Sequence, residues 1–164
     1  AQTGTGKTAA FGLPLLHRLL DMGHPPAPKT VRALILAPTR ELVNQITDNL
    51  EIFTRGTPVK VTMVVGGASL FKQAERLKRG SDVLVATPGR LIDLLERGDV
   101  TLSATGYLVL DEADHMLDMG FIHALRKIAR HIPLKRQTLL FSATMPKDIE
   151  ELAGTYLRDP VRVQ

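Results

Sequence analysis

The stretch VRALILAPTREL, residues 31–42, decides the fold because it joins an apolar strand to a helix through a short turn. Its first seven residues are almost continuously apolar, which is typical of a strand covered on both faces. Pro38 and Thr39 then break the run, and apolar residues recur at helical spacing from Arg40 onward. A strand that leads straight into a helix is the building unit of a parallel α/β sheet.

The same unit recurs along the chain, where short β-rich runs alternate with longer runs of helical period. Such alternation requires right-handed crossovers and predicts a mostly parallel sheet with helices on both faces. We therefore expect one α/β domain over residues 1–164, with strands at residues 31–37, 59–65, 82–86, 107–110, 137–141 and 161–163, and helices at residues 7–22, 40–54, 69–79, 89–97, 121–131 and 147–157.

The composition supports a folded domain and excludes several other classes of protein. With 44% hydrophobic and 23% charged residues, the chain does not suit disorder, collagen-like repeats or a long coiled coil. Aromatic residues are only 4%, so Val, Ile, Leu and Ala must build the core. The absence of Cys excludes disulfides and thiolate metal sites and suits a reducing cytoplasm, where we expect the protein. No apolar run approaches the ~18 residues of a membrane span.

The charge is mildly basic and unevenly distributed. The chain has 21 basic and 17 acidic side chains, a net charge of +4, and the excess of basic residues lies in the first half of the chain. A basic surplus permits a polyanionic partner, but a plain solvated basic face would have the same composition. Charge alone therefore leaves nucleic-acid binding open.

The first eight residues, AQTGTGKT, have the spacing of a phosphate-binding loop with Ala in place of the first Gly. Gly4 and Gly6 would let backbone amides turn toward a phosphate, Lys7 offers a positive charge, and the Thr8 hydroxyl is a ligand for Mg²⁺. A Gly-Lys-Thr sequence also occurs by chance, so this motif needs an acidic strand end to support it.

The stretch YLVLDEAD, residues 107–114, supplies that acidic strand end. Asp111 and Glu112 follow an apolar strand, and neighbouring carboxylates can divide the holding of Mg²⁺ and the activation of water. The alternative is that both residues simply cap a helix that begins near Ala113. The phosphate-binding loop favours the catalytic interpretation.

Six motifs in order, AQTGTGKT, APTREL, GG, TPGR, DEAD and SAT, resemble the first motor domain of DEAD-box ATP-dependent RNA helicases over essentially the whole chain. The resemblance implies a RecA-like P-loop NTPase domain, and we expect a bacterial-type member. It implies that the ATP phosphates bind at Gly4, Thr5, Gly6, Lys7 and Thr8, that Thr8 and Asp111 hold Mg²⁺, and that Lys7, Asp111 and Glu112 are catalytic.

The resemblance also implies an RNA-binding surface and a coupling element. Along the sugar–phosphate backbone of one RNA strand it places Pro38, Thr39, Arg40, Gly66, Gly67, Thr87, Pro88, Gly89 and Arg90. Asp114 would form a polar link with Ser142, Ala143 and Thr144 that couples the nucleotide state to strand separation. Amides, small residues and arginines suit a protein that holds RNA without reading its bases.

The resemblance further indicates what this sequence lacks. The glutamine-containing adenine motif would lie upstream of Ala1, and the second RecA-like domain would follow Gln164. We therefore expect a domain truncated at its N-terminus, with weak or no ATP hydrolysis by itself. Residues 1–5 are expected to be mobile or displaced, or held in shape by an anion at the amides of residues 4–8.

Two other functions stay open at this stage. A DNA-acting translocase of the same architecture would respond to DNA rather than RNA, although the DEAD and PTREL sequences disfavour it. A scaffold that binds nucleotide or RNA without hydrolysis is the other, but it would have no need to retain Lys7, Asp111 and Glu112.

Overall fold

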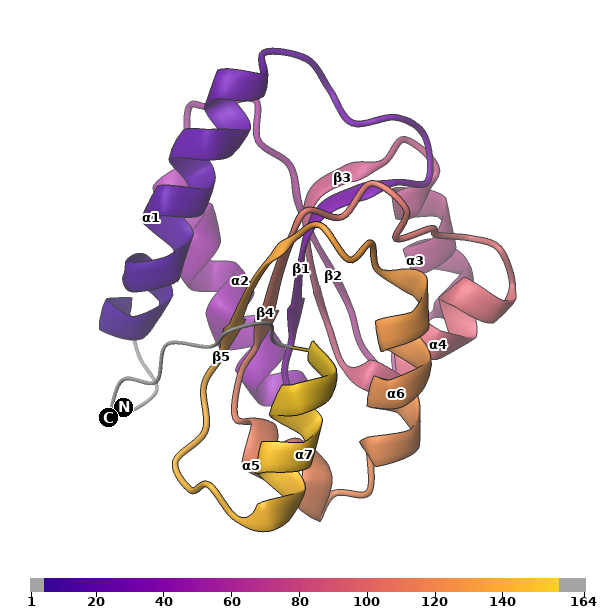
Figure 1. Cartoon of the computed structure of the whole chain (residues 1–164). Helices are drawn as coiled ribbons and strands as arrows, with labels where there is room; N and C mark the ends of the chain where they lie inside the picture. Colours follow the sequence, from indigo (N-terminus) through magenta and orange to yellow (C-terminus); the bar gives the residue numbers. More distant parts are fainter. Residues whose placement is uncertain (1–4, 157–164) are drawn as a thin grey trace.

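The computed structural model describes residues 5–156, in which strands and helices alternate (Figure 1). Its elements are α1 (Thr5–Met22), β1 (Val31–Leu36), α2 (Arg40–Thr54), β2 (Val61–Val64), α3 (Leu70–Leu77), β3 (Ser81–Ala86), α4 (Pro88–Glu96), β4 (Tyr107–Leu110), α5 (Ala113–Asp118), α6 (Ile122–His131), β5 (Gln137–Leu140) and α7 (Lys147–Tyr156).

The five described strands form one sheet in the order β2-β3-β1-β4-β5, and every neighbouring pair is parallel. Central strand β1 pairs with β3 and with β4, so Leu36 lies beside both Ala86 and Leu110. Strands β3 and β4 are buried along their whole length, whereas edge strand β5 is partly exposed. The predicted α/β fold with a parallel sheet is confirmed.

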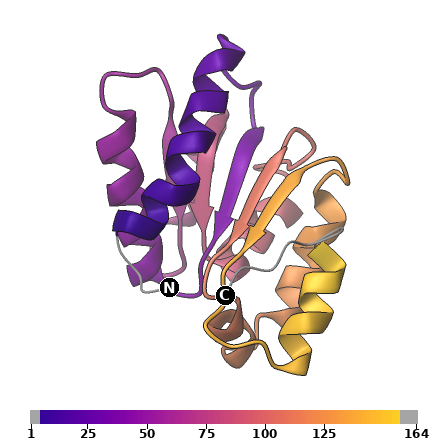
Figure 2. The same ribbon diagram turned by 60° about the vertical axis from the view of Figure 1, so that its left-hand side comes forward.

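Helices cover both faces of the sheet, as Figure 2 shows. Ala33 and Ile35 of β1 pack in a cluster with side chains of α1 and α2, including Phe11. Leu34 and Leu36 belong to a second cluster with side chains of α3 to α7. Because successive side chains of a strand point to opposite faces, one apolar strand contributes to both cores.

The element predictions are confirmed within the described residues, with shifts of up to two residues at element ends. Helix α1 begins at Thr5, two residues before the expected start, and α5 is a separate short helix absent from the expected set. The strand expected at residues 161–163 lies outside the described residues. Among residues 5–156, the helices lack the combined length and apolarity that crossing a membrane requires.

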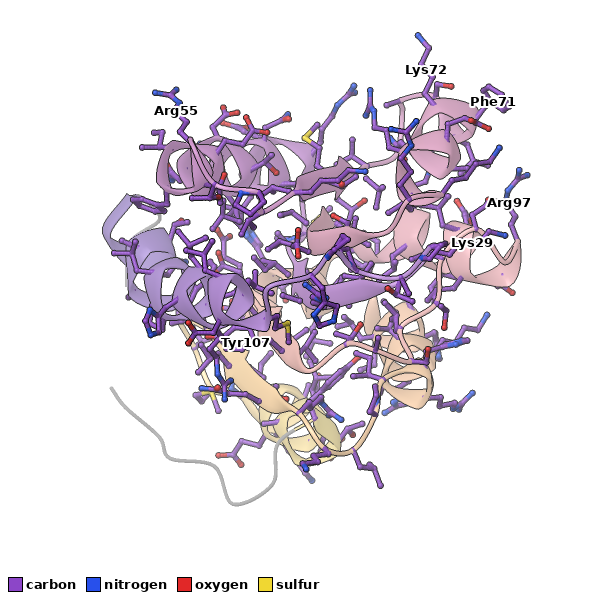
Figure 3. All side chains as sticks on the ribbon, turned by 90° about the horizontal axis from the view of Figure 1, so that it is seen from above. Lys29, Arg55, Phe71, Lys72, Arg97 and Tyr107 are labelled. Atoms are coloured by element: carbon purple, nitrogen blue, oxygen red, sulfur yellow. The ribbon has the colours of Figure 1, made fainter. Side chains whose placement is uncertain are left out.

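The carboxyl ends of the strands lie at one edge, the lower edge in Figure 1. In open parallel sheets, ligands bind at this edge. Figure 3 views the opposite edge, where Lys29, Arg55 and Arg97 extend outward. The motifs that follow the strands therefore share the edge that is hidden in that view.

Candidate functional site

The centre of the candidate site is an ion pair between residues 104 positions apart in sequence. The Nζ atom of Lys7, in the first turns of α1, donates to Oδ1 of Asp111, which follows β4, at 2.7 Å. Their side chains are only 7% and 1% exposed. Burial raises the pKa of Asp111, and the hydrogen bond from Lys7 opposes that rise. The structure thus brings the phosphate-loop lysine and the strand-end carboxylate together.

Phe141 also contributes to this centre, and sequence reasoning missed it. The ring centroid lies 5.7 Å from Nζ of Lys7, within the range of a cation–π contact. The same ring packs against Phe11 at 6.0 Å between centroids. An aromatic residue directly after an apolar strand, before SAT, was the available signal.

The other loop residues are placed only in part. Gly4 and residues 1–3 lie outside the described residues, so of the expectation for residues 1–5 only the part on Thr5 falls within them. Thr5 begins α1 and is not in a separate loop. No heavy atom lies within 4 Å of where a side chain on Gly6 would begin. Thr8 is buried on the same helix turn as Lys7.

Glu112 has an unusual backbone, with φ 50° and ψ 53°. It is the N-cap residue of α5, yet its side chain makes no capping hydrogen bond. Instead, Nδ1 of His115 lies 2.8 Å from Oε1 of Glu112. The side chain of Asp111 therefore pairs with Lys7, and that of Glu112 with His115. The alternative that both side chains simply cap the helix is not supported.

Asp114 joins the DEAD motif to the SAT segment. The amide and hydroxyl of Thr144 donate to Oδ2 of Asp114 at 3.2 and 3.1 Å. Ser142 donates to the carbonyl of Thr144 at 2.7 Å, which holds the segment around Ala143 in a turn. Partial burial raises the pKa of Asp114, but the bonds from Thr144 and His115 outweigh it and hold the pKa below its ordinary value. The expected link between these motifs is present.

The PTR and GG motifs lie next to each other at the same edge. Thr39, which follows Pro38, caps α2 by accepting a hydrogen bond from the amide of Leu42 at 3.1 Å. Arg40 is exposed at the first position of α2. A side chain on Gly67 would begin 3.2 Å from Nη1 of Arg40, and Gly67 has φ +80°, which glycine adopts readily.

The TPGR motif forms the start of α4. Thr87 stands at the N-cap and Pro88 at the first turn, where proline is tolerated because its missing amide would be unbonded. A side chain on Gly89 would begin 4.0 Å from Cε1 of Phe121, so the space beside this glycine is open. Arg90 reaches the GG motif, since its Nη1 donates to the carbonyl of Ala68 at 2.9 Å.

Comparison with known proteins identifies relatives of this chain. Residues 1–152 match the model of the DEAD/DEAH box helicase family. The chain is 51% identical to the probable ATP-dependent RNA helicase ddx3 of Dictyostelium discoideum, over 96% of this chain and 24% of that protein. It is 47% identical to the DEAD-box ATP-dependent RNA helicase CshA of Streptococcus pneumoniae, over 100% of this chain and 30% of that protein.

A solved structure shows the same fold. The yeast DEAD-box splicing factor Prp28 superposes with a TM-score of 0.81 at 41% identity, over 96% of this chain and 38% of that one. The relatives come from bacteria and eukaryotes, so the expected bacterial type is not confirmed. The chain spans between 24% and 38% of the lengths of these three relatives. By its matched residues, its fold and its relatives, the chain belongs to the DEAD/DEAH box helicase family.

Proposed function

We propose that this chain is the ATP- and RNA-binding motor domain of an ATP-dependent RNA helicase, in which ATP hydrolysis drives local unwinding of RNA duplexes. The observation that carries the proposal is the contact between Lys7 and Asp111 at the carboxyl edge of the sheet. A buried lysine and a buried carboxylate, joined across the two motifs of a phosphate site, suit nucleotide hydrolysis. The names of the relatives support the choice of RNA.

The residues present fit ATP with Mg²⁺. Within residues 5–156, no group of three or more His, Cys, Asp or Glu is arranged to hold a metal ion by itself, but Mg²⁺ usually takes one or two carboxylates, with substrate phosphates and waters as the other ligands. The hydroxyl of Thr8 and the carboxylate of Asp111 would hold the ion, while the amides of residues 4–8 and Lys7 would hold the phosphates. Bound Mg²⁺ neutralises charge that develops on the phosphates during transfer.

Glu112 would orient and deprotonate the water that attacks the terminal phosphate. Its carboxylate is adjacent to Asp111 in sequence, and the left-handed backbone turns the chain sharply between the strand end and α5. His115 holds one carboxylate oxygen in place. A positioned base next to the metal-holding carboxylate is the division of roles that phosphoryl transfer to water needs.

The RNA-binding surface would be formed by the PTR, GG and TPGR motifs, whose residues meet around the glycine turn. Backbone amides, two glycines and Arg40 would hold the sugar–phosphate backbone independently of sequence. The bonds between Asp114 and Thr144 would transmit the nucleotide state to that surface. The full-length protein would add a second RecA-like domain, and we propose the cytoplasm as its location.

The decisive experiment measures ATP hydrolysis by the full-length protein with single-stranded RNA, single-stranded DNA or no nucleic acid. We expect stimulation by RNA and little by DNA of matched sequence. Equal stimulation by both would favour the DNA translocase, and ATP binding without hydrolysis would favour the scaffold. Strand displacement from a short labelled RNA duplex then tests unwinding itself.

A further inference from the structure

Two side chains outside the glycine turn hold its two flanking carbonyls. Gly66 and Gly67 form a turn between β2 and α3. On one side, Nε2 of Gln73 donates to the carbonyl of Val65 at 3.0 Å. On the other, Nη1 of Arg90 donates to the carbonyl of Ala68 at 2.9 Å. The turn is therefore held at both ends, although its two glycines have no side chains.

The two holding side chains are bonded to each other. Nη1 of Arg90 donates to Oε1 of Gln73 at 3.1 Å, so the amide of Gln73 uses both of its ends. Gln73 is 2% exposed, and the side chain of Arg90 is 13% exposed. The hydrogen bond between these two side chains is therefore well shielded from water. Hydrogen bonds are electrostatically stronger in such a low-dielectric environment than in water.

Hydrogen bonds of the backbone around Gln73 fix the direction of its side-chain amide. The amide N–H of Gln73 donates to the carbonyl of Ser69 at 3.1 Å, and the hydroxyl of Ser69 accepts from the amide of Lys72 at 3.2 Å. These bonds form the first turn of α3. Figure 3 shows the neighbours Phe71 and Lys72 extending outward from this helix, while Gln73 is buried.

We propose that Gln73 is a positioning residue for RNA binding, which acts by holding the Gly66–Gly67 turn in register with Arg40. This inference rests on the proposed RNA-binding function. The guanidinium of Arg40 lies 3.2 Å from where a side chain on Gly67 would begin, so a shift of the turn changes the space beside that cation. Nη1 of Arg90 is occupied by the carbonyl of Ala68 and the side-chain oxygen of Gln73, so this atom holds the turn, while Arg90 stays among the residues proposed to bind RNA.

The proposal predicts a specific pattern of binding. In the full-length protein, Gln73→Leu keeps the side-chain volume but leaves the carbonyl of Val65 and the guanidinium of Arg90 short of a partner. We expect affinity for a labelled single-stranded oligouridylate, measured with a non-hydrolysable ATP analogue, to fall roughly tenfold. Affinity for the ATP analogue alone should stay within about twofold of the wild type, because Gln73 lies outside the Lys7–Asp111 centre.

The salt dependence separates positioning from direct contact. Gln73 touches no phosphate in the proposal, so the slope of log affinity against log salt should match the wild type. Arg40→Met, which removes a cation from the RNA-binding surface, should weaken binding and make the slope shallower by about one unit. Gln45→Leu, at an exposed position of α2, is the matched control and should bind RNA as the wild type does.

A second readout needs no RNA. Hydrogen–deuterium exchange of a peptide covering residues 64–73 should accelerate in Gln73→Leu, because the turn and the first turn of α3 lose their anchor. Gln73→Glu keeps the acceptor that faces Arg90 but opposes a carboxylate to the carbonyl of Val65, so it should also bind RNA less tightly. This variant replaces Gln73→Leu if the leucine variant does not fold.

The outcomes separate the two proposals. Wild-type RNA affinity in the folded Gln73 variants, unchanged exchange of residues 64–73, or a salt slope that falls along with affinity would each overturn the positioning role. Failure of the wild-type protein to bind RNA, with faster exchange in Gln73→Leu, would overturn RNA binding and leave the role of Gln73 in the turn intact.

Discussion

At the scale of single residues, Glu112 combines a strained backbone with a specific partner. Its φ of 50° is left-handed, which costs a residue with a side chain about 1–2 kcal/mol. His115, on the first turn of α5, is hydrogen-bonded to the Glu112 side chain and helps to hold this conformation. Strain that persists next to Lys7 and Asp111 is consistent with a carboxylate held ready for a reaction.

The roles of Lys7 and Glu112 are separable by mutation. In the full-length protein, Lys7→Ala should abolish ATP binding or nearly so, because in the proposed site Lys7 would meet phosphate in the ground state. Glu112→Gln should leave binding largely intact and remove hydrolysis, because in the proposed site Glu112 would act on water in the chemical step. Nucleotide titration and steady-state ATP hydrolysis measure the two effects, and equal loss of affinity in both variants would contradict this division.

His115 should titrate above its ordinary pKa. Its bond to the Glu112 carboxylate raises the pKa from the usual 6.5, although the ring is largely exposed. The contribution of the His115–Glu112 pair to folding stability is therefore complete below pH 6.5. It is lost as the pH rises through the higher pKa that His115 has in the folded protein. An NMR titration of the imidazole should show this shift, and Glu112→Gln should reduce it. A midpoint that does not change in Glu112→Gln would assign the shift to another group.

At the scale of elements, the turn before β3 is locked against a loop distant in sequence. Gly80 has φ +79°, and a side chain there would begin 2.3 Å from the carbonyl oxygen of Ala27. The amide of Gly80 also donates to the carbonyl of Leu77 at 2.9 Å, which closes the C-terminal end of α3. The proline-rich stretch before β1 thus packs directly on a glycine.

Replacement of Gly80 should cost more stability than replacement of Gly98. Both glycines have positive φ, but no heavy atom lies within 4 Å of the missing side chain of Gly98. Gly98→Ala should lower the free energy of unfolding by about 1–2 kcal/mol through the backbone alone. Gly80→Ala adds a clash with backbone and should cost about 3 kcal/mol or more. Urea denaturation measures both, and equal losses would mean that the loop yields.

The link between α5 and the SAT segment should govern coupling and not nucleotide binding. Asp114→Asn weakens the bonds from the amide and hydroxyl of Thr144, whereas the bond between Lys7 and Asp111 is untouched. We expect ATP affinity within about threefold of the wild type, with duplex unwinding reduced roughly tenfold or more. Thr144→Val should reproduce the defect, and normal unwinding by both variants would exclude a coupling role.

At the scale of the whole molecule, one parallel sheet with two apolar layers positions the described parts of the motifs at one edge. The described residues include Lys7 and Asp111 of the proposed ATP site and the surface proposed for RNA. The relatives are between about two and a half and four times as long as this chain. A second RecA-like domain would complete both sites from the other side.

The isolated 164-residue chain should therefore hydrolyse ATP far more slowly than the full-length protein. Arginine fingers supplied by a second domain are worth about 10³–10⁵ in rate, and none would be present here. Steady-state hydrolysis with saturating RNA compares the two proteins. Similar turnover would show that this chain contains the complete catalytic machinery.

Much of the architecture follows from local chemistry and is readable from sequence. Apolar runs broken by small and polar residues determine the order of strands and helices, because each needs only its own periodicity. Parallel connection then places all strand ends at one edge, so the meeting of Lys7 with Asp111 could be anticipated from motif order, whereas the link of Asp114 with Thr144 was expected from the family resemblance.

Only the tertiary structure decided the contacts that depend on exact side-chain placement across elements. Gln73 looks like an ordinary polar helix residue until packing buries it between Val65 and Arg90. The left-handed Glu112 and its bond to His115 depend on how α5 leaves the sheet. A sequence pattern specifies which face a residue occupies, but hydrogen-bond partners require distances near 3 Å, which only the assembled layers of the fold determine.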